Sequence, residues 1–188
     1  MKMQRVLFKV LGSMICFTLV FGLMATVSYA KSKGEINESV KAALKTFKKH
    51  VHGANDYLKV AKGVLVIPNV TKAAFVIGGQ YGQGALRVGG STVDYYSLAA
   101  GSVGWQIGAE QSDIIIIFAT TAALEKFRSS EGWEAGADAE VTLVDAGVTA
   151  PVSTLVSQHP ILGFVIDQKG LMAGVSIKGA KFTRIKTD

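Results

Sequence analysis

Hydrophobic positions recur every three or four residues over residues 32–62, and this spacing predicts a helical segment with one apolar face. Ser32 followed by Glu35 is the sequence of a capping box, so we expect the helix to begin there. Gly53 is expected to divide the segment into two helices, and Gly63 to end it. The predicted apolar face consists of Ile36, Val40, Leu44, Phe47, Val51, Ala54, Leu58 and Ala61.

From Gly63 onward the apolar period falls to two residues, which predicts β-strands. The run 114–118 is apolar at every position, so we expect it at the centre of a sheet. Pro68 is expected to end the first strand. Further predicted strands cover 73–88, 92–98, 132–145 and 163–186, with one hairpin over 101–110 and 113–120, a short helix over 121–130 and a helical turn over 151–158.

Glycines are frequent in the predicted strands, and one short motif recurs. The segment GWQIGA at 104–109 matches GWEAGA at 132–137, and GLMAGV at 170–175 has the same outline. Glycines on one face of a strand permit tight curvature or close approach of another element, including a ligand. We therefore predict an α+β fold with a mainly antiparallel, strongly coiled, barrel-like sheet, an N-terminal amphipathic helical segment and a short middle helix.

The first 30 residues have the layout of a secretory signal peptide. Three basic residues precede an apolar run over 10–25, and the small residues Ser28 and Ala30 suit cleavage after Ala30. We expect a periplasmic or secreted protein in which 31–188 form one domain, helical over 32–62 and β-rich over 63–186. An uncleaved membrane anchor, or a lipoprotein acylated at Cys16, are the alternatives.

Charge is unevenly distributed along the 188 residues. The chain has 20 Lys and Arg against 14 Asp and Glu, a formal net charge of +6. Residues 31–72 hold nine lysines and three acidic residues, a net +6, whereas 73–188 have eight basic and eleven acidic residues, a net −3. The basic character is therefore local, which bears on the binding partner and not on the fold.

Several lysines fall beside the apolar face of the predicted helix. At about 100° per residue, one flank holds Lys41, Lys45, Lys48, His52 and Lys59, and Lys62 lies at its edge. Lysines next to an apolar stripe suit an anionic bilayer surface. The alternative is that the stripe packs on the protein's own sheet while the lysines are solvated. Only three arginines follow the first 30 residues, and we expect no nucleic-acid partner.

No motif for catalysis or metal binding is present. His50 and His52 are two residues apart on a predicted helix and point to different sides, and His159 precedes a proline. The glycine-rich stretch 78–84 fits neither phosphate-loop pattern, and no nucleophile motif occurs. We expect no enzymatic activity, no cofactor and no metal site.

Four segments together resemble the SYLF lipid-binding domain family, and the resemblance extends from about residue 44 to residue 185. Many relatives have Pro-Gly-Ala where this chain has His52-Gly53-Ala54, which predicts a softer bend here. The segments are 61–68 (AKGVLVIP), 78–87 (GGQYGQGALR), 132–136 (GWEAG) and 164–174 (FVIDQKGLMAG).

The resemblance implies non-catalytic binding of lipid or membrane through the helical part and basic residues. Eukaryotic members are associated with phosphoinositide membranes and some with actin, which an exported protein does not normally meet. We expect anionic phospholipid as the partner, with an envelope structural or protein-interaction role as the alternative. The predicted headgroup-binding residues are Lys41, Lys45, Lys48, Lys59, Lys62, Lys72 and Arg87.

Overall fold

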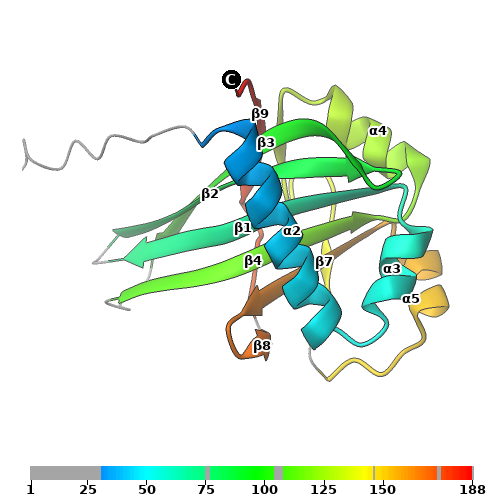
Figure 1. Cartoon of the computed structure of the whole chain (residues 1–188). Helices are drawn as coiled ribbons and strands as arrows, with labels where there is room; N and C mark the ends of the chain where they lie inside the picture. Colours follow the sequence, from blue (N-terminus) through cyan, green and yellow to red (C-terminus); the bar gives the residue numbers. More distant parts are fainter. Residues whose placement is uncertain (1–30, 75–76, 104–107, 146, 173–174, 188) are drawn as a thin grey trace, which may run out of the picture. The chain divides into compact units, whose positions relative to one another are not determined.

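The computed structural model describes residues 31–74, 77–103, 108–145, 147–172 and 175–187. Residues 31–188 form one compact unit, in which helices pack on both faces of a large sheet (Figure 1). The helices are α2 (Lys33–His50), α3 (Ala54–Val60), α4 (Thr121–Ser129) and α5 (Val152–Gln158). The strands are β1 (Gly63–Ala74), β2 (Ile77–Val88), β3 (Ser91–Val103), β4 (Gly108–Phe118), β5 (Gly132–Glu134), β6 (Thr142–Leu143), β7 (Ile161–Asp167), β8 (Gly170–Leu171) and β9 (Lys181–Ile185).

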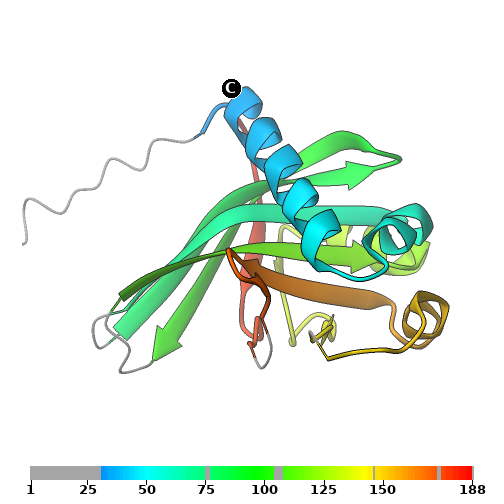
Figure 2. The same ribbon diagram turned by 60° about the horizontal axis from the view of Figure 1, so that its bottom comes forward.

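The strands form one sheet in the order β5-β9-β3-β2-β1-β4-β7-β6, with β8 added beside β7. All described pairs are antiparallel except β6 with β7. The sheet curls strongly into a half-barrel (Figure 2), and its longest strands are β1 to β4. The predicted α+β class, the mainly antiparallel coiled sheet, the N-terminal helix and the middle helix are therefore confirmed.

Both faces of the sheet are covered, so alternate residues of a strand enter different cores. Leu65, Ile116 and Phe118 belong to one core with Leu124 and Phe127 of α4. Val64, Val66, Ile115 and Ile117 belong to the other core, which α2, α3 and α5 cover. All five residues from Ile114 to Phe118 are buried, and β4 lies between β1 and β7, which confirms their predicted central position.

The helical segment begins and divides where the sequence predicts. Ser32 accepts a hydrogen bond from the backbone N–H of Glu35, and the Glu35 carboxylate accepts one from the Ser32 N–H at 2.8 Å. These bonds close the capping box. The hydrogen bond from the Ser32 N–H, together with one from the Ser32 hydroxyl at 2.9 Å, lowers the pKa of Glu35 because both favour its charged form. Gly53 separates α2 from α3 with a φ of 73°, a left-handed conformation that glycine adopts readily. The segment ends earlier than expected, because α3 stops at Val60 and Gly63 already begins β1.

Two strand predictions are wrong. Pro68 does not end the first strand: β1 continues to Ala74 through a bulge, where the pairing with β4 shifts between Ile67 and Val70. A proline is tolerated at a bulge because no ladder hydrogen bond requires its missing N–H. The hairpin predicted over 101–110 and 113–120 is also not formed. Residues 108–118 are one strand that pairs with β1 and β7, and residues 104–107 lie outside the described residues.

The repeated glycine motif contributes to packing where it is described. Its first copy includes residues 104–107 and its third includes 173–174, which lie outside the described residues. In the second copy, Trp133 is fully buried against Phe127 and Phe182, with ring centroids 5.4 and 5.7 Å away. This tryptophan fills the core and lines no groove.

Candidate functional site

The predicted apolar face of the helices is divided between the core and the surface. Ile36, Val40 and Phe47 are completely buried, and they pack on the sheet with Val66, Ile115 and Phe164 in the same core. The predicted alternative, in which the stripe packs on the protein's own sheet, therefore holds for these residues. They are not available for insertion into a bilayer in this structure.

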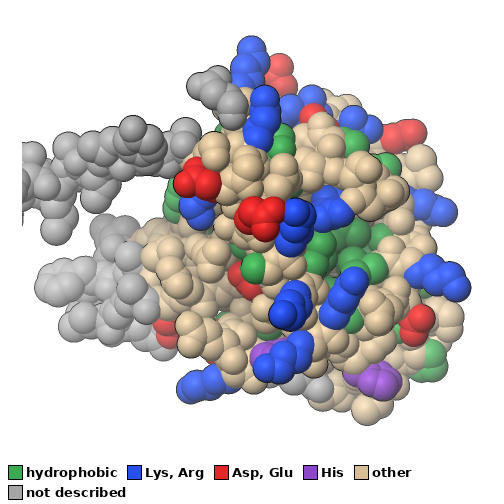
Figure 3. All heavy atoms as spheres, in the orientation of Figure 1, with side chains coloured by type: hydrophobic (Ala, Val, Ile, Leu, Met, Phe, Trp, Pro, Cys, Tyr) green, Lys and Arg blue, Asp and Glu red, His purple; other side chains and the backbone are tan. Residues whose placement is uncertain are grey.

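Three members of the stripe are only partly buried, and they line a surface groove. Leu44 on α2, Leu58 on α3 and Ala61 after α3 form its apolar floor together with Val64 of β1. The groove has a volume of about 420 Å³, and we call it the α2–α3 groove. Figure 3 shows hydrophobic side chains at the base of this region with Lys and Arg side chains around them. Its complete lining is Leu44, Lys48, Leu58, Lys59, Ala61, Gly63, Val64, Arg87, Gly89 and Gly90.

Three cations surround this floor, and each comes from a different element. Lys48 lies one helical turn after Leu44 on α2, Lys59 follows Leu58 on α3, and Arg87 projects from β2. The lining includes no carboxylate, so its formal charge is +3. Positive charge around a partly apolar hollow suits an anionic group attached to an apolar body.

The position of Arg87 depends on the tight turn that joins β2 to β3. Gly89 and Gly90 occupy this turn with φ values of 58° and 84°, which only glycine adopts without strain. The Arg87 guanidinium donates a hydrogen bond to the carbonyl oxygen of Gly90. One end of the guanidinium is thereby fixed, and its remaining N–H groups stay available as donors.

The other predicted headgroup residues lie outside the lining of the groove. Lys45 and Lys62 are exposed, and Lys41 is exposed but paired with Glu38 at 2.6 Å. Lys72 lies at the far end of β1, 4.0 Å from the carboxylate of Glu110, and both line a different cavity of about 630 Å³. The structure thus brings Lys48, Lys59 and Arg87 together and separates Lys72 from them.

Sequence reasoning missed the glycines of the groove. Gly89-Gly90 between two apolar runs is a hairpin signal, and it would have placed Arg87 next to a tight turn.

Among the described residues, no cluster of three or more His, Cys, Asp or Glu side chains could hold a metal ion. None of the helices in the described part of the chain is both long and apolar enough to cross a bilayer.

The comparisons define the class of protein. Residues 99–187 match the model of a family described as "Ysc84: Las17-binding protein actin regulator". This match to the Ysc84 (SYLF) family model confirms the resemblance that the sequence motifs indicate. The matched region begins in β3, so it includes none of the groove residues.

Among curated proteins, the chain is similar to LAS seventeen-binding protein 3 of Saccharomyces cerevisiae, in strains YJM789 and ATCC 204508/S288c. In both cases the sequences are 30% identical over 132 residues, which covers 66% of this chain and 28% of the yeast protein. The chain therefore spans little more than a quarter of the length of these relatives. Their names describe binding to the protein LAS seventeen.

Proposed function

We propose that the α2–α3 groove binds the headgroup of an anionic phospholipid at a membrane surface, without catalysis. The observation that supports this proposal is the convergence of Lys48, Lys59 and Arg87 around a partly apolar floor that has no carboxylate. In this arrangement the three cations contact the phosphate oxygens. Leu44 and Leu58 contact the apolar part of the lipid next to its headgroup.

The mode of contact differs from the insertion of an amphipathic helix. Because Ile36, Val40 and Phe47 are buried in the core, α2 contributes charge and the rim of the groove and keeps its apolar face on the sheet. Each basic residue near an anionic surface contributes about 1 kcal/mol. Three such residues contribute about 3 kcal/mol, which corresponds to a factor of roughly 100 in affinity.

The remaining lysines of the helical segment have a supporting role in this proposal. Lys41 and Lys45 are exposed on the same helix as Lys48, and Lys62 is exposed after α3. Their charges attract an anionic surface over roughly one Debye length, about 8 Å at physiological ionic strength. Export to the periplasm or beyond, after cleavage behind Ala30, is the setting that we propose for this binding.

The test is co-sedimentation of the full-length protein with vesicles of two compositions. One is phosphatidylcholine alone, and the other contains about one third phosphatidylglycerol, a lipid with one negative charge. We expect retention on the anionic vesicles, which added salt weakens. Retention on neutral vesicles measures any contribution of the apolar run over residues 10–25, which all variants share.

Charge reversal at the groove provides the specific variant. Changing Lys48, Lys59 and Arg87 to Glu lowers the formal net charge from +6 to 6 − 6 = 0. The matched control changes the exposed residues Lys33, Lys178 and Lys186 to Glu, which gives the same net charge away from the groove lining. We expect the groove variant to lose affinity by a factor of roughly 100 or more, and the control to lose much less. Equal loss in both variants would show that net charge, and not the groove, governs binding.

A second candidate function is the binding of an acidic protein segment in the same groove. The support is that the similar yeast protein is named for binding another protein. If neither vesicle composition retains the wild-type protein, the lipid proposal is wrong and this alternative is favoured. The same groove variant and control would then be compared for binding to an acidic peptide.

A further inference from the structure

A second cavity, larger than the groove, lies at the end of the helical segment and is not part of the proposed headgroup site. Its volume is about 860 Å³. The α2–α3 turn, α3, the segment that leads into α5, and β8 surround it. Pockets of roughly 300–1,000 Å³ are typical of sites for small organic ligands.

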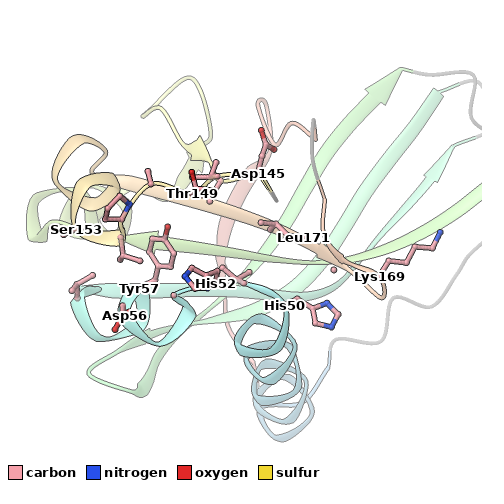
Figure 4. Close-up of a pocket in the computed structure, with 18 residues that line it drawn as sticks. His50, His52, Asp56, Tyr57, Asp145, Thr149, Ser153, Lys169 and Leu171 are labelled. Atoms are coloured by element: carbon pink, nitrogen blue, oxygen red, sulfur yellow. The ribbon is translucent and has the colours of Figure 1, made fainter.

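The lining of this cavity combines aliphatic side chains with the imidazoles of His50 and His52 and the hydroxyls of Thr149 and Ser153. Charged residues occur at its rim, where Asp56, Asp145 and Lys169 are exposed, and Figure 4 shows Asp56 and Lys169 directed away from the centre. A charged group placed among the aliphatic side chains would lose hydration, which is costly unless it reaches an oppositely charged partner. The aliphatic lining consists of Val51, Val60, Val144, Val148, Val152 and Leu171.

Tyr57 supplies a polar group inside this lining. Its ring is held in the core by an edge contact with Phe164, whose centroid is 5.0 Å away, and Phe164 contacts Phe47 at the same distance. The hydroxyl group points into the cavity on the side where Thr149 lies (Figure 4). It has no hydrogen-bond partner in the described part of the chain. Burial raises the pKa of Tyr57, so the hydroxyl stays protonated and acts as a donor.

We infer that this cavity binds an uncharged lipid-like molecule, a single acyl chain that ends in an ester, whose carbonyl oxygen accepts a hydrogen bond from Tyr57. The valine and leucine side chains contact the chain. Two carboxylates, Asp56 and Asp145, against one lysine at the rim favour a neutral ester over a free carboxylate. This site is separate from the α2–α3 groove: Tyr57 and Val60 line the cavity, whereas Leu58 and Lys59 line the groove.

The inference is tested by calorimetric titration of the full-length protein with methyl decanoate, with decanoate as the charged counterpart. Val148 is 39% exposed at the mouth of the cavity, so Val148→Trp is expected to fill the mouth without disturbing the core. The matched control is Val93→Trp, at a residue that is 42% exposed and outside the cavity lining. We expect V148W to weaken ester binding at least about ten-fold, because the new side chain overlaps the ligand, and V93W to leave it unchanged.

The hydroxyl group is tested by Tyr57→Phe, which keeps the ring contact with Phe164. Loss of one neutral hydrogen bond predicts roughly five-fold weaker binding of the ester. The control is Tyr81→Phe at an exposed tyrosine elsewhere on the sheet. The inference is overturned if the wild type does not bind the ester, if V148W binds it as well as V93W does, or if decanoate binds as tightly as the ester. None of these outcomes depends on vesicle binding, so this inference and the proposed function can fail independently.

Discussion

The close approach of β1 and β2 at Gly84 allows a sharp test of the fold. Gly84 is buried within β2, and a Cβ atom placed there would lie 1.9 Å from the carbonyl oxygen of Val66 and 2.7 Å from the Cα of Ile67. Both atoms belong to the backbone of β1, so no rotation of a side chain relieves the contact. We predict that Gly84→Ala strongly destabilises the protein.

The magnitude follows from the displacement that the new methyl group requires. Ordinary contact begins at 3.4 Å, so β1 must move by about 3.4 − 1.9 = 1.5 Å at this point. Overpacking of this kind costs about 1–3 kcal/mol, and loss of one or two neighbouring ladder hydrogen bonds adds about 1 kcal/mol each. The expected loss in the free energy of unfolding is therefore about 2–5 kcal/mol, or a fall in Tm of roughly 10 °C for a domain of this size.

The assay is thermal and urea denaturation followed by circular dichroism, with Gly101→Ala as the matched control. Gly101 lies in the adjacent strand β3, and a Cβ there meets no heavy atom within 4 Å. Its replacement should change stability by no more than about 0.5 kcal/mol. If G84A and G101A have the same midpoint, then β1 and β2 do not approach each other at Gly84 as described.

Two further predictions concern the helical segment and one partly buried acid. Gly53→Ala should destabilise the protein by about 1–2 kcal/mol. The reason is that φ is 73° at this residue and that the added Cβ would lie 2.8 Å from the Cγ2 of Val152. Equal urea midpoints for the variant and the wild type would contradict this prediction. Burial raises the pKa of Asp113, although a hydrogen bond from the Asn69 N–H at 2.9 Å opposes the shift. The folded state therefore holds this proton more tightly than the unfolded state, and ionisation at neutral pH reduces stability. Asp113→Asn keeps an acceptor oxygen and should raise Tm at pH 7. This gain in Tm should shrink as the pH falls toward about 4, where the wild-type carboxyl group is itself protonated. A gain in Tm that is constant with pH would refute the explanation.

The periodicity of the helical segment predicted its apolar residues but not what covers them. Ile36, Val40 and Phe47 recur with the same spacing as Leu44 and Leu58, yet the first three are buried and the last two line a groove. Leu44 is on the same helix as the three buried residues, so the difference depends on which side of each helix faces the sheet. This is a property of the tertiary structure, so no local pattern contains it.

The groove itself shows a second limit of reasoning from the sequence. Lys48 and Lys59 are both in the predicted helical segment, but Arg87 lies 87 − 48 = 39 residues after Lys48. Its position depends on the pairing of β1 with β2 and on the turn at Gly89 and Gly90. Motif resemblance included Arg87 among the basic candidates, and only the sheet shows why it belongs with the other two.

The wrong hairpin prediction has a definite physical origin. Gln111 and Ser112 interrupt two apolar stretches, and such a polar pair is typical of a turn. In the structure they continue β4, since Thr71 and Val70 of β1 pair with them. The predicted strand end at Pro68 is wrong for the same reason, because a bulge accommodates this proline within a long strand. Turn signals are thus overridden where a neighbouring strand supplies pairing across them.

The central strand has a consequence for biogenesis. Ile114–Phe118 is a run of five large apolar residues with high β-propensity and no charge, the composition of an aggregation-prone segment. One of its flanking strands, β1, precedes it in the chain. Its other neighbour, β7, comes later: Leu162 pairs with Ile117 and follows it by 162 − 117 = 45 residues. During synthesis this stretch stays uncovered on one side until β7 emerges, so refolding yields should fall as protein concentration rises.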